Sequence, residues 1–98
     1  MLERDYQRRL IKKIEDSFPR CLVLKNDPTF RQGVPDLLIL FEDKWAMLEV
    51  KRSASEAFQA NQEYYIDLLN EMSFASAISP EIEEEVLDGL RSKFGHSR

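Results

Sequence analysis

The chain has 98 residues, of which 43% are hydrophobic and 33% charged, so we expect a single domain with a hydrophobic core rather than a disordered tail. Its formal net charge of −4 argues against a generic polyanion binder, which is usually strongly basic. A single cysteine excludes an internal disulfide and a cysteine-rich zinc site, and we expect a cytoplasmic protein without a membrane span or signal peptide.

The spacing of apolar residues predicts seven elements. Apolar side chains recur every three or four positions in the expected helices, and they run continuously or alternate in the expected strands. Pro19 ends the first helix, and Pro80 begins the last one with Ser79 as its cap. In chain order we expect a helix over 2–18, strands over 20–26, 35–41 and 45–51, a helix over 56–72 capped by Ser53 or Ser55, a strand over 74–78, and a helix from 80 that ends before a frayed tail at 95–98.

The order α-β-β-β-α-β-α implies a mixed α/β (α+β) domain over residues 1–94, in which helices flank a central mixed four-stranded sheet. The run 35–41 is almost entirely apolar, which is typical of a central strand covered on both faces. The glutamates at 83–85 are expected to face water, and Cys21 is expected to be a small core residue.

Polar residues interrupt the predicted hairpin at one end. Asp36 opens an apolar strand, although a buried carboxylate without a partner is costly. Glu49 and Lys51 share one face of their strand, roughly 6–7 Å apart along it. In a hairpin that turns near residues 42–44, Asp36 lies level with Glu49 to Lys51, so we expect two carboxylates and an ammonium group to converge.

Two more polar residues lie on apolar helix stripes. Glu3 precedes Tyr6 on the first helix and adds a carboxylate at the rim of the core. Gln62 lies between Phe58 and Tyr65 inside the stripe of the second helix, where a buried amide needs hydrogen-bond partners. Acidic residues also favour helix starts, so Glu3 has an ordinary structural explanation as well.

An acidic pocket of this kind suits a hard divalent cation, Mg²⁺ or Mn²⁺. Magnesium usually takes one or two carboxylates together with waters, and Asp36, Glu49 and the carbonyl of Val50 are the candidate ligands. Lys51 can orient or deprotonate an attacking water and balance developing charge. The structural alternative for Asp36, Glu49 and Lys51 is an ion pair at the end of a sheet.

The run Gly33-Val34-Pro35-Asp36, followed after twelve residues by Glu49-Val50-Lys51, resembles the motif of the PD-(D/E)XK nuclease superfamily. Glu3 upstream and Gln62 downstream extend the resemblance. Over nearly its full length the chain is similar to the minimal stand-alone VRR-NUC-type nucleases of phages and bacteria. The resemblance implies a restriction-endonuclease-like core and a metal-dependent endonuclease without an organic cofactor.

Carried over by position, the resemblance makes Asp36 and Glu49 metal ligands and Lys51 the catalytic lysine. Glu3 corresponds to a helix-one carboxylate that binds the metal directly or through water. Gln62 corresponds to a glutamine that contacts the lysine or the scissile region.

The resemblance also implies structure-selective cleavage of four-way junction or flap DNA, as in DNA repair and recombination, by a homodimer, since symmetric cutting needs two sites related by a two-fold axis. Arg31, Gln32 and Arg52 flank the predicted site and can hold phosphates, and Lys25 lies in the same loop region. Gly33 allows close approach of the backbone or of DNA. Solvated loop charge is the alternative for these residues.

A different class of function stays open. Residues 1–52 carry 11 basic and 9 acidic side chains, whereas residues 53–98 carry 3 and 9. The acidic second half favours a non-catalytic module that keeps the nuclease fold and binds a protein partner. A nuclease that is active only within a larger complex is a third possibility.

Overall fold

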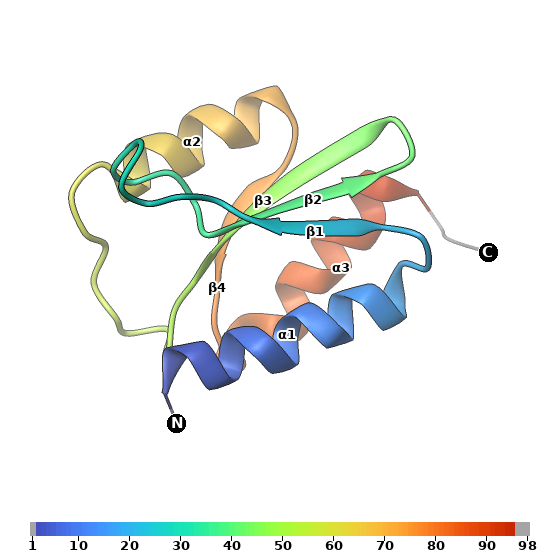
Figure 1. Cartoon of the computed structure of the whole chain (residues 1–98), viewed down its shortest axis with the longest axis horizontal. Coiled ribbons are helices and arrows are strands. Elements are labelled where there is room, and N and C mark those ends of the chain that lie inside the picture. Colours follow the sequence, from blue (N-terminus) through green and yellow to red (C-terminus); the bar gives the residue numbers. More distant parts are fainter. Residues whose placement is uncertain (1, 96–98) are drawn as a thin grey trace.

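The computed structural model describes residues 2–95 as three α-helices and a four-stranded mixed sheet (Figure 1). This arrangement confirms the mixed fold class expected from the sequence. The elements are α1 (Glu3–Ser17), β1 (Leu22–Lys25), β2 (Leu37–Phe41), β3 (Lys44–Val50), α2 (Gln62–Met72), β4 (Ala75–Ile78), a 3₁₀ turn (Pro80–Ile82) and α3 (Glu83–Phe94).

The strands lie in the order β1-β2-β3-β4, in which β1, β2 and β3 are antiparallel neighbours and β4 is parallel to β3. A tight turn joins β2 to β3, and Glu42 in it has a positive φ of 57°. Leu37 pairs with Leu48, so Asp36, one residue before β2, lies level with Glu49. The hairpin therefore brings the two acids together as predicted.

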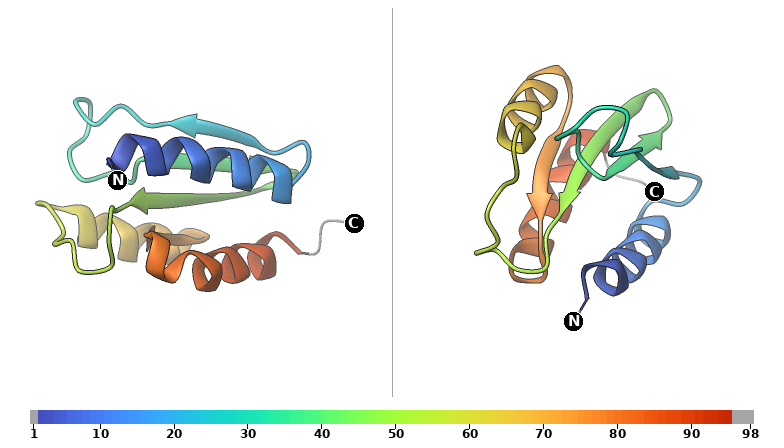
Figure 2. Two further views of the ribbon diagram at one scale, coloured as in Figure 1. Left: turned by 90° about the horizontal axis from the view of Figure 1, so that it is seen from below. Right: turned by 60° about the vertical axis from the view of Figure 1, so that its left-hand side comes forward.

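One face of the sheet carries the hydrophobic core. Leu37, Ile39 and Phe41 alternate toward this face and are buried. Helices α1 and α3 cover it, while α2 lies on the opposite face (Figures 1 and 2). Phe18 of the α1 C-cap and Phe94 of α3 pack around Phe41 with ring centroids 5.3–5.8 Å apart.

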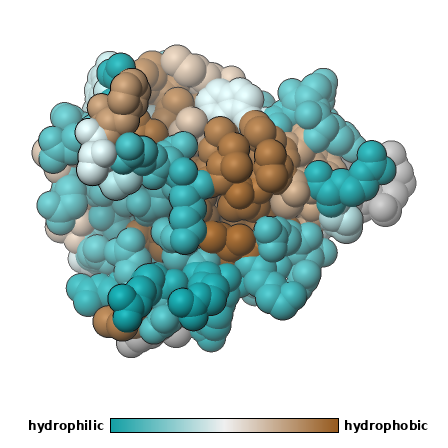
Figure 3. All heavy atoms as spheres, in the orientation of Figure 1, coloured by the Kyte–Doolittle hydropathy of each residue, from teal (hydrophilic) through white to brown (hydrophobic). Residues whose placement is uncertain are grey.

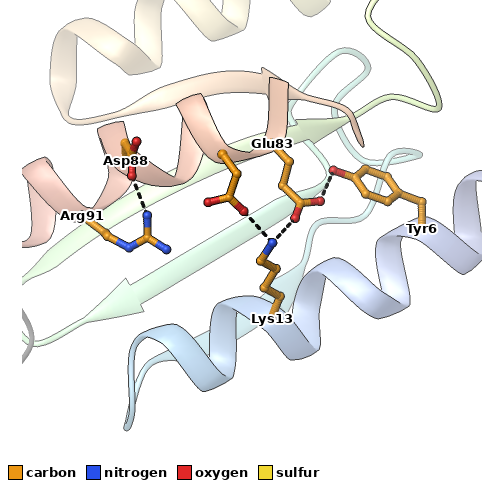
Figure 4. Close-up of polar contacts among 6 residues, drawn as sticks. Tyr6, Lys13, Glu83, Asp88 and Arg91 are labelled. Carbon is orange, nitrogen blue, oxygen red and sulfur yellow. Dashed lines mark hydrogen bonds and ion pairs between the residues drawn. The ribbon is translucent and has the colours of Figure 1, made fainter. Parts of the chain in front are cut away.

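A polar cluster joins α1 to α3 (Figure 4). The hydroxyl of Tyr6 donates to Glu83 at 2.9 Å, and Lys13 donates to Glu83 and Glu84 at 2.5 and 2.6 Å. Burial raises the pKa of Tyr6 above its usual value, and the hydrogen bond to Glu83 adds to this. The expectation that residues 83–85 all face water was therefore wrong for Glu83, because the predicted helix pattern did not place α1 beside it.

The second helix begins later than predicted. Residues 56–61 form a loop, and α2 starts at Gln62 after Asn61, whose φ of 69° is left-handed. The hydroxyls of Ser53 and Ser55 lie 3.0 Å apart and bond to each other instead of capping the helix. Gln62 is the first residue of α2. The prediction that it lies inside a buried helix stripe was wrong, because α2 has no buried residue.

The expectation that both faces of the second strand are covered was also wrong. Leu40 of β2 is exposed on the sheet face that α2 occupies. Helix α2 contacts β3 and β4 and leaves the β1–β2 half of that sheet face open. Ser79 precedes the 3₁₀ turn but makes no cap hydrogen bond, while Pro80 does begin the turn. Cys21 packs at the edge of the core and is only partly buried.

Within residues 2–95, no helix is both long and apolar enough to cross a membrane. The frayed tail expected at 95–98 lies outside the described residues except for Gly95.

Candidate active site at the end of the hairpin

Asp36 is held in place by backbone groups on two sides. Its Oδ2 accepts a hydrogen bond from the N–H of Val50 at 2.8 Å. Its carbonyl accepts the N–H of Asn26 at 2.8 Å, and the side-chain amide of Asn26 donates to the carbonyl of Pro35 at 2.8 Å. Burial raises the pKa of the Asp36 carboxyl above its ordinary value. Asn26 and Val50 thus fix the carboxylate across from Glu49.

Glu49 is 4% exposed, which is unusual for a carboxyl group. Its Oε2 accepts a hydrogen bond from Gln62 at 2.8 Å, whereas its buried Oε1 has no hydrogen-bond donor among the described residues. Burial raises the pKa of Glu49 to about 8, with the negative charge of Asp36 as the second cause. Both burial and the neighbouring negative charge disfavour the ionised form of Glu49, so a proton or a cation near the pair would stabilise it.

The two carboxylates fit a hard cation, because the buried Oε1 of Glu49 has no hydrogen-bond donor among the described residues and a bound cation would satisfy it. Glu3 lies at the rim, where burial and the charges of Asp36 and Glu56 raise its pKa. Across the described part of the chain, no three His, Cys, Asp or Glu side chains are gathered closely enough to form a metal centre unaided. An ion here would rely on Asp36 and Glu49 together with water ligands.

Lys51 lies one residue beyond β3, and its side chain is buried. Its Nζ donates to Gln62 Oε1 at 2.8 Å and to the carbonyl of Ala57 at 3.1 Å, and it lies 5.3 Å from the ring centroid of Phe58. An ammonium group has three N–H donors, so one remains for a further acceptor. The backbone N–H of Lys51 also donates to Ile78, which fixes this position against β4.

Gln62 connects the acid and the amine. Its Nε2 donates to Glu49, while its Oε1 accepts from Lys51 and from the backbone N–H of Gln59 at 2.7 Å. These three bonds define which end of the amide faces which partner. As the first residue of α2, Gln62 takes its position from the rigid helix, so the sequence motif and the geometry agree on this residue although the predicted helix start was wrong.

Val50 contributes to the site through its N–H, which Asp36 accepts. Its predicted use as a carbonyl ligand remains a prediction. Sequence reasoning missed four other contributors: Asn26, Glu56, Ala57 and Phe58. Ala57 acts through a backbone carbonyl, which leaves no side-chain signal, and Asn26 resembled an ordinary strand-end residue. Glu56 accepts the backbone N–H of Arg52 at 2.7 Å and adds negative charge near Glu3.

The predicted phosphate-binding residues are spread around this end of the fold. Arg31 is exposed, 3.4 Å from the hydroxyl of Tyr65, and Arg52 lies 3.9 Å from Glu56. Gln32 is exposed in the loop between β1 and β2, and Lys25 is exposed at the end of β1. Gly33 has a φ of 96°, and a Cβ there would lie 2.6 Å from Cβ of Asn61. Its close approach is therefore to the start of α2.

Comparison of the chain with protein-family models, with curated proteins and with solved structures gives no match.

Proposed function

We propose that the chain is a Mg²⁺- or Mn²⁺-dependent DNA endonuclease of the PD-(D/E)XK type that hydrolyses phosphodiester bonds. The observation that carries this proposal is the buried Asp36–Glu49 pair, in which Glu49 Oε1 has no donor within residues 2–95. The motif resemblance supports the same reading, because the residues that match it lie together at one end of the hairpin.

Asp36 and Glu49 would hold the ion, with Glu3 at the rim. When bound, the metal would polarise the phosphodiester and lower the pKa of a coordinated water. A structural ion pair explains these residues less well, since Lys51 donates to an amide and a carbonyl and forms no ion pair within 4.0 Å among the residues described.

Lys51 supplies a positive charge close to the carboxylates. Gln62 and Ala57 use two of its N–H groups, which aims the third and restricts the side chain to one position. A fixed ammonium can orient an attacking water or stabilise charge that develops on the phosphoryl oxygens. The amide of Gln62 accepts a hydrogen bond from Lys51 and donates one to Glu49, so it positions both side chains.

DNA binding would use phosphate contacts rather than base readout. Arg31, Gln32, Arg52 and Lys25 lie in loops and at strand ends near this end of the hairpin and would offer donors to phosphate oxygens. The net charge of −4 disfavours tight binding to any duplex, which favours selection of branched DNA by shape. Two sites related by a two-fold axis would cut both strands of such a junction, so the proposal includes a homodimer.

The second candidate function is a protein-binding module, which the acidic second half of the chain favours. A module of that kind has no need for a buried glutamate with an unpartnered oxygen beside a buried lysine. Binding of Mg²⁺ that depends on Glu49 separates the two functions.

The test is cleavage of labelled four-way junction, flap and linear duplex DNA with Mg²⁺ and with chelator. We expect cleavage of a branched substrate with Mg²⁺ only, and a loss of at least ~100-fold in Asp36→Asn. Asp43→Asn, an exposed aspartate in the turn of the same hairpin, is the matched control and should cut as the wild type does. The catalytic proposal fails if no substrate is cut or if Asp36→Asn retains full activity.

A further inference from the structure

Phe30, in the loop between β1 and β2, is 82% exposed, which is the largest exposed fraction among the large hydrophobic residues within 2–95. The exposed leucines of the strands differ from it. Leu22, Leu24 and Leu40 belong to the sheet, and the space-filling view shows a broad hydrophobic patch in the middle of the molecule (Figure 3). Single exposed hydrophobic residues are common on proteins. What distinguishes Phe30 is that a fixed loop holds it next to a hollow.

Hydrogen bonds fix the loop that carries Phe30. The carboxylate of Asp27 accepts the N–H of Thr29 at 2.9 Å and its hydroxyl at 2.7 Å. The N–H of Phe30 donates to the carbonyl of Asp27 at 3.3 Å. Beyond the ring, Gly33 lies against Asn61, so the loop is next to the start of α2 (Figure 1). The phenyl ring is therefore presented from a defined backbone.

Arg31 connects this ring to α2. Its guanidinium carbon lies 5.8 Å from the centroid of the Phe30 ring, and its Nη1 lies 3.4 Å from the hydroxyl of Tyr65. Tyr65 belongs to the same helix as Gln62, which contacts Glu49. Aromatic rings and guanidinium planes are the surfaces on which proteins stack nucleobases. The loop thus offers both kinds of surface beside the candidate active site.

An open hollow of about 390 Å³ lies next to the ring, lined by Asn26, Asp27, Phe30, Arg31 and Val34. Small-molecule sites usually have volumes of roughly 300–1,000 Å³. Phe30 and Val34 give the hollow apolar walls, whereas Asn26 and Asp27 supply oxygen atoms that can accept hydrogen bonds. The carboxylate of Asp27 would repel a phosphate group, so an uncharged ring with N–H donors suits the hollow better.

The hollow borders the candidate active site. Asn26, which lines it, donates its backbone N–H to the carbonyl of Asp36 and its side-chain amide to the carbonyl of Pro35, both at 2.8 Å. Val34, on another wall, precedes Asp36 by two residues. A nucleotide held in the hollow would therefore lie beside the carboxylates that are proposed to bind the metal.

We propose that this hollow binds an unpaired nucleobase, which stacks on Phe30, and that it makes flap DNA the preferred branched substrate. The inference rests on the proposed function, because it takes DNA as the substrate. Stacking tolerates any base, since every base has a π-face. A base inside a duplex must be unpaired and unstacked before it can enter, whereas the nucleotides of a flap are already unpaired. Phe30 thus selects a DNA structure without reading its sequence.

The first test is equilibrium binding of flap DNA, measured by fluorescence anisotropy with chelator so that no cleavage occurs. Phe30→Ala should raise the Kd ~5- to 100-fold, which corresponds to the loss of one base–aromatic stack. Phe30→Trp keeps a ring and should bind as the wild type does, whereas Phe30→Leu is apolar without a ring and should bind as weakly as Phe30→Ala. Leu22→Ala is the matched control, since Leu22 is also exposed but lies at the other end of β1, and its Kd should be unchanged.

The second test changes the DNA instead of the protein. Among flap substrates that each carry an abasic site at a different unpaired position, one should weaken wild-type binding about as much as Phe30→Ala does. The same abasic site should not weaken Phe30→Ala further, because the base and the ring act as a pair. The proposal is overturned if the wild type binds flap and linear duplex DNA equally, if Phe30→Ala binds as the wild type does, or if the two losses are independent.

Cleavage separates this proposal from the proposed function. With Mg²⁺, Phe30→Ala should lose the preference for flap over linear duplex, while its calorimetric signal with Mg²⁺ stays unchanged, because Phe30 is not part of the carboxylate pair. A wild type that binds the flap in this base-dependent way but cuts no DNA would disprove the nuclease and support the base site. A wild type that cuts both DNAs equally, or a preference that Phe30→Ala retains, would disprove the base site and leave the nuclease intact.

Discussion

The side-chain amide of Gln62 donates a 2.8 Å hydrogen bond to Oε2 of Glu49, a residue that is buried in the fold. This bond satisfies one of the two carboxylate oxygens and leaves the other without a donor among residues 2–95. An uncompensated acid of this kind destabilises the folded chain unless a proton or a cation neutralises it. The proposed activity and the stability of the chain therefore both depend on Glu49.

Glu49→Gln should abolish cleavage while leaving the fold intact. The substitution keeps the shape of the side chain but removes the charge that would hold the cation, so we expect at least ~100-fold slower cleavage and no calorimetric signal with Mg²⁺. The free energy of unfolding at pH 8 should be unchanged or higher, because a buried charge is lost. Glu42→Gln, in the turn of the same hairpin, is the control and should behave as the wild type.

The stability of the metal-free chain should fall as the pH rises. The pKa of Glu49 is about 8 when folded, against an ordinary value of 4.5, so the folded state keeps a proton that the unfolded state releases between these values. This contribution is complete below about pH 4.5 and is lost by about pH 8. Urea unfolding from pH 5 to 9 measures it. Added Mg²⁺ should recover stability at pH 8, and Glu49→Gln should remove most of the slope, whereas an unchanged slope in that variant would rule out Glu49 as its source.

Gln62→Ala should reduce the cleavage rate more than it reduces Mg²⁺ binding. The amide positions Lys51 and Glu49 but supplies no metal ligand in the proposed site, so we expect a 10- to 100-fold lower rate, on the order of the 1.5–3 kcal/mol of hydrogen bonds to charged groups. Gln59→Ala is the matched control, since Gln59 contributes only its backbone N–H. Equal losses in the two variants would show that Gln62 has no special role.

Tyr6→Phe should destabilise the fold without affecting cleavage. The buried hydroxyl donates to the carboxylate of Glu83, and its removal leaves that acceptor with Lys13 alone. We expect a loss of about 1–2 kcal/mol in the free energy of unfolding, measured with urea. An unchanged free energy of unfolding would mean that the α1–α3 contact depends on packing rather than on this hydrogen bond.

Gly33→Ala should disturb the site from a distance. The residue has a positive φ, and a new Cβ would overlap Asn61 directly before Gln62, so the loop and α2 must separate. We expect destabilisation of about 1–3 kcal/mol and slower cleavage. Gly95→Ala is the control, because Gly95 also has a positive φ but nothing lies within 4 Å of a Cβ there. If the two variants are equally stable, the close approach of Gly33 to Asn61 does not affect the stability of the fold.

The hairpin could be predicted well because its register follows from local rules. Strand alternation and a short turn place Asp36 level with Glu49 whatever packs around them. The start of α2 could not be predicted in this way. Residues 56–61 contain good helix formers such as Glu56 and Ala57, but in the fold the carbonyl of Ala57 binds Lys51 and Asn61 packs against Gly33. Such tertiary contacts override local propensity and leave no pattern in the sequence.

The apolar run of β2 was misleading for a related reason. Continuous hydrophobicity indicates that both faces of a strand are covered, but it does not identify what covers them. Leu40 is exposed within the chain because α2 lies over the other half of its face. Similarly, the helix pattern of Glu83 predicts a solvated residue, but in the fold Tyr6 of α1 donates a hydrogen bond to it. Contacts between elements distant in sequence were the common source of error.

The turn at residues 42–43 lies at the far end of the hairpin from Asp36 and Glu49, with five residues of β2, about 16 Å of strand, in between. Both turn residues are exposed, and among the described residues their side chains form hydrogen bonds with Lys44 alone. This turn is therefore a suitable place to graft an affinity peptide or a fluorescent dye, so that single-molecule imaging could follow the protein without altering its chemistry.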